Sequence, residues 1–161
     1  MNHLETVHSK ILNSGNIEQV LTVARLTSKK IVFTNGCFDI LHRGHVEYLA
    51  QASDYGDILI LGLNSDASVR KLKGPERPIN SEQSRAITMA SLKYVDFVYI
   101  FDEDTPFQLI NQIQPDVLVK GGDYIIEEIV GYDIVTAKGG QVLTIPFVDG
   151  FSTTGIINKM K

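Results

Sequence analysis

The chain has 161 residues, of which 43% are hydrophobic and 21% are charged, and its formal net charge is −4 at pH 7. This length and composition suit one ordinary globular domain with a buried core. The single cysteine excludes an internal disulfide, and the negative charge gives no general attraction to nucleic acid or to an anionic membrane. No apolar run reaches the length of a membrane span, and residues 1–5 lack the features of a signal peptide, so we expect a cytoplasmic protein.

Residues 1–30 show apolar side chains at helical spacing, interrupted at residues 13–16. We predict two short helices there, as an N-terminal extension to an α/β core over residues 31–161, the whole forming a single domain. The helices are expected to pack on the sheet as an amphipathic pair. The alternative hypothesis is that they form a dimer contact.

Five apolar or β-branched runs follow, with helical stretches between them. We predict strands at 31–33, 58–63, 97–100, 117–119 and 142–145, and intervening helices from about residue 46 and at about 82–92, 105–113 and 125–137. Strands that alternate with helices imply βαβ crossovers, so the expected fold is α/β, a Rossmann-like, doubly wound, five-stranded parallel sheet.

Polar segments follow four of these strands, at residues 35–45, 64–66, 120–123 and 149–154. The carboxyl ends of parallel strands meet at one edge of the sheet, where ligands bind in this architecture. The turns expected at the opposite edge are ordinary ones. We therefore predict a ligand site at the carboxyl edge.

Two histidines, His42 and His45, flank Gly44 where a helix is expected to begin after the first strand. A single histidine there would suggest a helix cap or a core residue. A zinc site would need further ligands, but the other two histidines lie within the first eight residues and there is only one cysteine. Because a helix start attracts anions, we predict that both histidines donate hydrogen bonds to phosphoryl oxygens.

Four cations, Arg70, Lys71, Lys73 and Arg77, stand in a stretch of residues 70–80 that also contains glycine and two prolines. This composition predicts an irregular loop beside the carboxyl edge. Our hypothesis is that the loop closes over a triphosphate, with Lys73 and Arg77 neutralising its charge. The alternative is a solvated charged loop.

Ser152, Thr153 and Thr154 precede the last helical stretch. One hydroxyl is enough to cap a helix, so the others are expected to contact phosphate. Lys120 stands at a strand end before two glycines, and a cation followed by flexible backbone suits an anionic substrate. An exposed lysine beside a turn is the alternative for Lys120.

The segment Thr34–His45, with its Asn-Gly-Cys-Phe-Asp turn and its His-x-Gly-His element, resembles the cytidylyltransferase-like nucleotidyltransferase superfamily. Further motifs agree in order, namely Asn64-Ser65-Asp66, Lys73-Gly74, Arg77-Pro78, Asp116–Tyr124 and Gly150–Thr154. Within the superfamily they resemble most closely the D-glycero-β-D-manno-heptose 1-phosphate adenylyltransferase domains. The resemblance covers about residues 25–161.

This resemblance implies an enzyme that transfers the adenylyl group of ATP to D-glycero-D-manno-heptose 1-phosphate. The products are ADP-heptose, for lipopolysaccharide or another surface glycan, and pyrophosphate. The sugar phosphate carries its own ionised oxygen, so direct in-line attack on the α-phosphorus needs no covalent nucleophile. Mg²⁺ is expected to bridge triphosphate oxygens rather than to occupy a dedicated protein cage. A homo-oligomer is implied, with a dimer favoured, and neither nucleic acid nor membrane is expected as a partner.

The candidate site residues fall into three groups. Those assigned to catalysis are His42, His45, Lys73 and Lys120. Those assigned to the nucleotide are Thr34, Asn35, Gly36, Cys37, Phe38, Asn64, Arg77, Ser152, Thr153 and Thr154. Those assigned to the sugar phosphate are Asp39, Lys120, Gly121, Gly122, Asp123 and Tyr124. For Asp39 the alternative is that it only braces the turn, and for Cys37 it is a packing role.

Two other functions compete with this one. The first is a CTP-dependent cytidylyltransferase of glycerol 3-phosphate or another small phospho-alcohol. Those enzymes typically end in Arg-Thr-x-Gly-x-Ser-Thr-Thr, whereas residues 147–151 before Ser152 contain no arginine here. The second is a nucleotide-binding regulator without turnover, which the intact histidine pair argues against. Glu76 departs from the heptose enzymes, which often have a small residue at that point of the loop.

Overall fold

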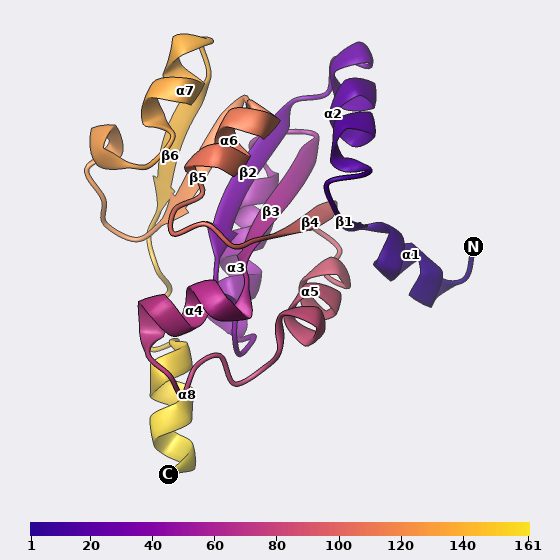
Figure 1. Cartoon of the computed structure of the whole chain (residues 1–161). Coiled ribbons are helices and arrows are strands. Elements are labelled where there is room, and N and C mark those ends of the chain that lie inside the picture. Colours follow the sequence, from indigo (N-terminus) through magenta and orange to yellow (C-terminus); the bar gives the residue numbers. More distant parts are fainter.

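The computed structural model describes residues 1–161 and contains one parallel sheet of six strands in the order β1-β4-β3-β2-β5-β6 (Figure 1). The strands are β1 (Ile11–Leu12), β2 (Ile31–Gly36), β3 (Ile58–Asn64), β4 (Phe97–Phe101), β5 (Val117–Gly121) and β6 (Gln141–Ile145). From β2 the chain first builds the sheet outward through β3 to β4, and it then returns to the other side of β2 with β5 and β6. The strand order therefore reverses between β2 and β5, and their carboxyl ends mark the place where such sheets bind ligands.

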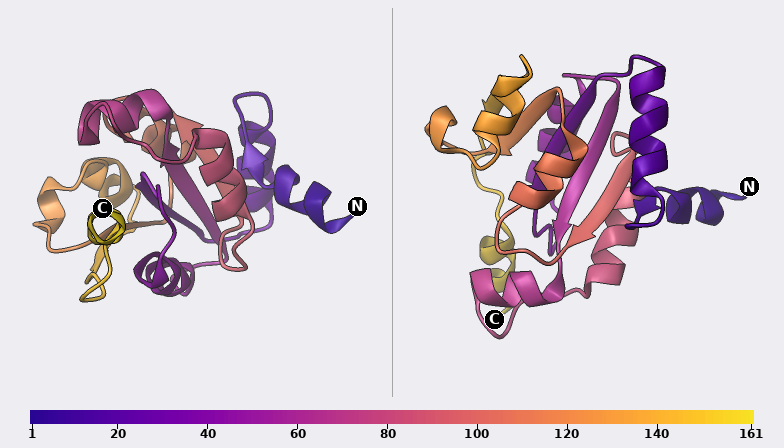
Figure 2. Two further views of the ribbon diagram at one scale, coloured as in Figure 1. Left: turned by 90° about the horizontal axis from the view of Figure 1, so that it is seen from below. Right: turned by 45° about the horizontal axis from the view of Figure 1, so that its top comes forward.

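Helices cover both faces of this sheet (Figures 1 and 2). They are α1 (His3–Ser9), α2 (Ile17–Leu26), α3 (Arg43–Ser53), α4 (Asp66–Lys73), α5 (Glu82–Ala90), α6 (Phe107–Ile113), the 3₁₀ turn η1 (Ile126–Glu128), α7 (Tyr132–Ala137) and α8 (Thr153–Met160). Side chains of α2, α6 and α7 join one buried cluster, and side chains of α3 and α5 join the other. Helices α4 and α8 lie at the carboxyl edge of the strands, and α1 extends away from the sheet beside α5 (Figures 1 and 2). None of the helices is both long enough and apolar enough to cross a membrane.

The two hydrophobic clusters follow from the alternation of side chains along the central strands. Phe33 and Ile60 point into the cluster under α2 and α6, whereas Val32 and Leu61 point into the cluster under α3 and α5. A strand that is buried on both faces needs an almost continuous apolar sequence, which is what residues 58–63 supply. The predicted doubly wound parallel class is thereby confirmed.

The predicted number of strands is wrong, because β1 makes a sixth strand inside the N-terminal extension. Ile11 pairs with Val98 and Leu12 with Tyr99, and the N–H of Val98 donates to the carbonyl oxygen of Lys10 at 2.9 Å. Two residues are too few to show the period of two by which a strand is identified in a sequence. Only the neighbouring β4 gives this segment its extended form.

Two other predicted segments differ in the structure. Residues 70–73 are not part of an irregular loop but form the last turn of α4, which Ser65 caps through a hydrogen bond from the N–H of Ser68. The cations in that turn suit the negative end of the helix dipole. The helix predicted over residues 125–137 is divided into η1 and α7 by Gly131, whose φ of 93° does not fit a right-handed helix.

Candidate functional site

The histidine pair lies at the start of α3, beside the point where the strand order reverses. His42 is the N-cap residue of α3, and His45 lies in its first turn. The two imidazole rings stack, with their centroids 3.7 Å apart and 22° between their planes. Phe38 packs against the His45 ring at 5.1 Å and 64°. Two adjacent imidazoles at a helix N-terminus form a compact group of hydrogen-bond donors for an anion.

The surroundings keep both imidazoles neutral near neutral pH. Burial lowers the pKa of His42, and burial together with the charge of His42 lowers the pKa of His45 to about 4. The Nδ1 atom of each ring is sequestered without a hydrogen-bond partner, whereas the Nε2 atoms are not sequestered in this way. The Nε2 atoms are therefore the ones available to a ligand, and a bound phosphate would raise both pKa values through its negative charge.

Acid is expected to destabilise the folded chain through His45 between about pH 6.5 and pH 4. In that window an unfolded chain, with an ordinary histidine pKa of about 6.5, binds a proton that the folded chain, with a pKa of about 4, does not bind. The free energy of unfolding should therefore fall as the pH is lowered, and His45→Gln should flatten this part of the profile in urea unfolding. His8→Gln, at an exposed position, is the matched control. An unchanged slope in His45→Gln would contradict the prediction.

Gly44 lets the segment before α8 approach the histidines. A Cβ atom at Gly44 would lie 3.0 Å from Cε1 and Nδ1 of His42 and 3.3 Å from Cβ of Phe151. The guanidinium carbon of Arg43 lies 5.5 Å from the centre of the Phe151 ring. A side chain at position 44 would push these groups apart, so the close approach of the two segments depends on glycine.

The start of α8 lies beside the turn between β2 and α3. The hydroxyl oxygen of Ser152 accepts a hydrogen bond from the N–H of Gly155 at 2.9 Å, so the predicted helix cap is confirmed. The hydroxyl of Thr153 donates to the carbonyl oxygen of Ile40 at 3.5 Å, and Thr154 is exposed. The N-termini of α3 and α8, each with N–H groups that the helix itself does not use, therefore converge at the carboxyl edge.

Lys120 carries a partly desolvated charge at the end of β5. Burial lowers the pKa of its ammonium group, an effect that the nearby Cys37 opposes. Its Nζ atom lies 5.8 Å from the centre of the Tyr124 ring, and it takes part in none of the ion pairs of the structure. An ammonium group without a carboxylate partner is well suited to bind an anionic ligand.

Phe147 covers the backbone that follows Lys120. A Cβ atom at Gly121 would lie 2.9 Å from the Phe147 ring, and one at Gly122 would lie 2.6 Å from it. The two glycines therefore make room for this ring, although Phe147 as a residue is 71% exposed. Motif reasoning does not include Phe147 in the site. Phe147 is assigned to the site only because its ring contacts Gly121 and Gly122.

Asp39 anchors the loop of residues 74–81 to the turn after β2. Its buried carboxylate accepts hydrogen bonds from Nε of Arg77 at 2.7 Å and from the N–H groups of Ile79 and Asn80 at 2.8–3.0 Å. Burial by itself would raise the pKa of Asp39, but these hydrogen bonds lower it below its ordinary value. For Asp39 the structure therefore favours the bracing alternative over a contact with the sugar phosphate, because the protein's own donors already bind the carboxylate.

Arg85 is a central residue of the site that sequence reasoning misses. Its side chain is fully buried, and its Nη1 atom donates to the carbonyl oxygens of Cys37 at 2.7 Å and Asn64 at 2.8 Å. Its Nε atom donates to the carbonyl oxygen of Asn80 at 3.0 Å, and its Nη2 atom pairs with Asp66 at 2.8 Å. One guanidinium group therefore connects the turn after β2, the end of β3, the start of α4 and the loop before α5.

Two predicted nucleotide residues use their side chains within the fold. The hydroxyl groups of Thr34 and Tyr48 lie 2.6 Å apart, and Thr34 is fully buried. The amide nitrogen of Asn64 donates to the hydroxyl of Ser68 at 3.0 Å.

Several of the other predicted residues gather around the turn at residues 36–42. Arg77 and Arg85 reach this turn through Asp39 and through the carbonyl oxygen of Cys37. Burial raises the pKa of the Cys37 thiol, and the positive charges of Lys73, Arg85 and Arg77 oppose that rise. Asn35 and Gly36 are half-buried at the end of β2. Asp123 is exposed and forms no hydrogen bond within the chain, so nothing in the structure ties it to the site.

Comparison with known proteins agrees with this geometry. A family model described as cytidylyltransferase-like matches residues 33–159. The chain is 54% identical over 158 residues to the bifunctional protein HldE of Syntrophotalea carbinolica, covering 98% of this chain and 32% of that protein. It is 56% identical over 152 residues to the bifunctional protein HldE of Campylobacter concisus, covering 94% of this chain and 31% of that protein. The chain thus spans about a third of the length of these relatives.

A solved structure, the lipopolysaccharide core biosynthesis protein of Thermoplasma volcanium, is also similar to this chain. The TM-score is 0.61 at 28% sequence identity, and the match covers 74% of this chain and 97% of that one.

Proposed function

The chain belongs to the cytidylyltransferase-like family of nucleotidyltransferases, and we propose that it transfers the adenylyl group of ATP to D-glycero-D-manno-heptose 1-phosphate. The motifs from Thr34 to Thr154 support this substrate pair, and so does the similarity to a protein of lipopolysaccharide core biosynthesis. One sheet contains all the strands, from β1 at Ile11 to β6, which ends at Ile145. We therefore also propose that residues 1–161 form a single domain. The proposal concerns this chain alone and not the remaining two thirds of its bifunctional relatives.

The observation that carries the proposal is the stacked pair of His42 and His45 between the converging starts of α3 and α8. Their neutral rings offer Nε2 atoms to the α- and β-phosphate groups. Lys73 and the segment from Ser152 to Thr154 then bind the leaving pyrophosphate, and Lys120 binds the sugar phosphate. The placement of these donors at the point where the strand order reverses supports this assignment.

In the proposed reaction an oxygen of the sugar phosphate attacks the α-phosphorus, and the bond from that phosphorus to the β-phosphate oxygen breaks. The protein contributes orientation of two anions and neutralisation of the developing charge. No three histidine, cysteine, aspartate or glutamate side chains are grouped to hold a metal ion, and Asp39 is occupied by its own donors. In this proposal Mg²⁺ would enter with ATP and would neutralise part of the charge of the triphosphate.

The test is pyrophosphate release by the purified chain with Mg²⁺, crossing ATP and CTP with both anomers of the heptose 1-phosphate and with glycerol 3-phosphate. We expect turnover with ATP and one heptose 1-phosphate anomer only. Preference for CTP with glycerol 3-phosphate would replace the proposal by the cytidylyltransferase alternative. No release with any pair would point to a regulator without turnover.

Lys73→Ala is expected to weaken ATP binding about tenfold or more, since a charge-assisted contact with the triphosphate would be lost. The matched control is Lys71→Ala, two residues earlier on the same helix, because the Lys71 ammonium group already pairs with Asp104 at 2.9 Å. Both dissociation constants can be measured by isothermal titration calorimetry. Equal affinity in Lys73→Ala and the wild type would contradict the role of Lys73.

A further inference from the structure

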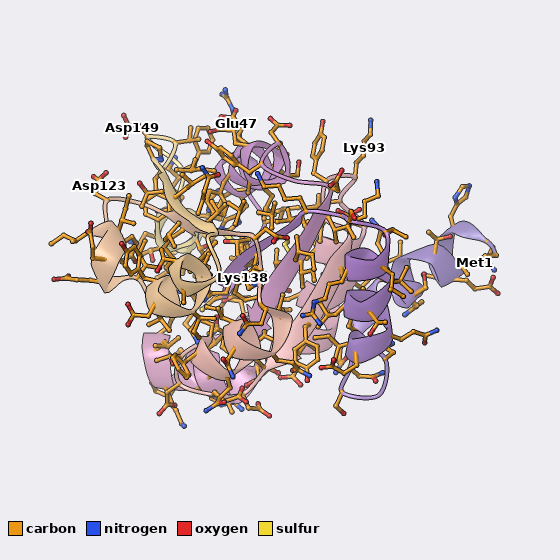
Figure 3. The ribbon with its side chains drawn as sticks, turned by 90° about the horizontal axis from the view of Figure 1, so that it is seen from above. Met1, Glu47, Lys93, Asp123, Lys138 and Asp149 are labelled. Carbon is orange, nitrogen blue, oxygen red and sulfur yellow. The ribbon has the colours of Figure 1, made fainter.

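A cleft at the amino edge of the sheet lies opposite the candidate site. It is formed where the chain enters the three neighbouring strands β2, β5 and β6, and its volume is about 650 Å³. Figure 3 views the molecule from this edge and labels Lys138, which lines the cleft. Of its eleven lining residues, only Ile31 is hydrophobic. The sequence predicts ordinary turns at this edge, so a cleft of this size was not expected.

The charge of this cleft is opposite to that of the whole chain. Arg25, Lys29, Lys30 and Lys138 line it, against the single carboxylate of Asp116. The chain as a whole has 15 basic and 19 acidic residues. Three of the cations lie within residues 25–30, from the last turn of α2 to the residue before β2, and Lys138 joins them from the end of α7. All four are exposed, so the fold concentrates positive charge at the surface of this edge.

The protein's own carboxylates neutralise these cations poorly. The four ion pairs elsewhere in the chain have N–O distances of 2.5–2.9 Å. At this edge the two pairs are longer, 3.8 Å from Lys29 to Asp57 and 3.4 Å from Lys138 to Asp116. Arg25 and Lys30 have no carboxylate within ion-pair distance.

Asp116 holds together the strand starts that form the cleft. Its Oδ2 atom accepts a hydrogen bond from the N–H of Ile31 at 2.8 Å, and its backbone carbonyl oxygen accepts one from Gln141 at 2.9 Å. Arg25 uses Nη2 to donate to the carbonyl oxygen of Ile113, which holds the guanidinium group in place while its other nitrogens stay free of hydrogen bonds within the chain. Asp116 thus has hydrogen-bond partners within the chain, and the charges of Arg25 and Lys30 remain without a carboxylate partner.

We propose that this cleft binds a small anion with two or more phosphate charges, at a site separate from the candidate active site. Against the four cations stand the carboxylates of Asp116 and of Asp57, which is paired with Lys29, so two positive charges are left over. This excess suits an anion with two or more negative charges, such as a diphosphate group. Arg25 and Lys30 bind the phosphate oxygens directly, since their charges have no other partner. Lys29 exchanges its weak contact with Asp57 for the ligand.

The test is a titration of the ¹⁵N-labelled full chain with inorganic pyrophosphate, followed by NMR. Amide signals of Gly139 and Gly140 report on the cleft, and those of Gly44 and Gly121 report on the carboxyl edge. We expect the cleft signals to shift along a saturable curve. The double variant Lys29→Gln/Lys30→Gln should raise the dissociation constant read from them about fivefold or more, and Lys93→Gln, at an exposed lysine far from the cleft in sequence, should not.

Shifts confined to Gly44 and Gly121 would overturn the proposal, and so would equal dissociation constants in the double variant and the Lys93→Gln control. Since the cleft signals are followed separately, failure here leaves the transfer reaction untouched, and failure of the transfer reaction leaves the cleft result standing. Added sodium chloride should weaken binding at the cleft, because the contacts are between charges near solvent.

Discussion

His45→Ala is expected to lower kcat/KM for pyrophosphate release about 10²–10³-fold, the loss typical of removing one preorganised donor to developing charge. The reduction should appear mainly in kcat, since the contact strengthens as charge moves onto the leaving group. The fold should tolerate the change, because the Nδ1 atom of His45 is already sequestered without a partner. The same side chain would thus matter greatly for turnover and little for stability.

Steady-state pyrophosphate release and urea unfolding of the same preparations can separate these two effects. The matched control is His8→Ala, an exposed histidine in α1 that should keep the wild-type rate. A His45→Ala variant that retains most of the wild-type kcat would contradict the role proposed for the pair. A variant that loses activity together with its cooperative unfolding transition would show that the ring is structural instead.

The features that could be predicted from the sequence are those that depend on residues adjacent in the chain. The central strand β3 is an unbroken apolar run, so its burial on both faces was predictable. The His-x-Gly-His element stands directly after a strand, and it was placed at the carboxyl edge by the parallel topology alone. The structure adds the stacking of the two rings and the depressed pKa of each.

The features that sequence reasoning missed depend on residues far apart in the chain. Strand β1 exists because Val98 pairs with it, and two residues carry no period of their own. For Asp39 the sequence leaves two roles open, bracing and substrate contact, because the donors to its carboxylate stand 38 to 41 positions away. Phe147 belongs to the site only because it lies on Gly121 and Gly122.

Arg85 is the clearest of these cases. It stands in an amphipathic helix, where an arginine is normally expected on the solvent-exposed face. It is instead fully buried, because the carbonyl oxygens of Cys37, Asn64 and Asn80 meet at one point and need donors. Only the tertiary fold brings these three carbonyl groups together.

Arg85→Met should reduce the free energy of unfolding by about 3–5 kcal/mol, since it leaves three carbonyl oxygens and the Asp66 carboxylate without their shared donor. Arg85→Lys should recover only part of this loss, because one ammonium group cannot reproduce the planar fork of a guanidinium group. The matched control is Arg70→Met, at an exposed position of α4, which should unfold at nearly the wild-type urea concentration.

The same substitution should also weaken nucleotide binding, and Arg85→Lys is the variant in which to measure this, because it is the one more certain to fold. The guanidinium group fixes the turn that presents the histidines to the loop that carries Arg77, so its loss lets these two segments move apart. We expect Arg85→Lys to raise the dissociation constant for ATP while leaving pyrophosphate binding at the amino-edge cleft unchanged. If Arg85→Met were as stable as Arg70→Met, the four hydrogen bonds would be contributing nothing net, and Arg85 could not be the residue that holds the carboxyl edge together.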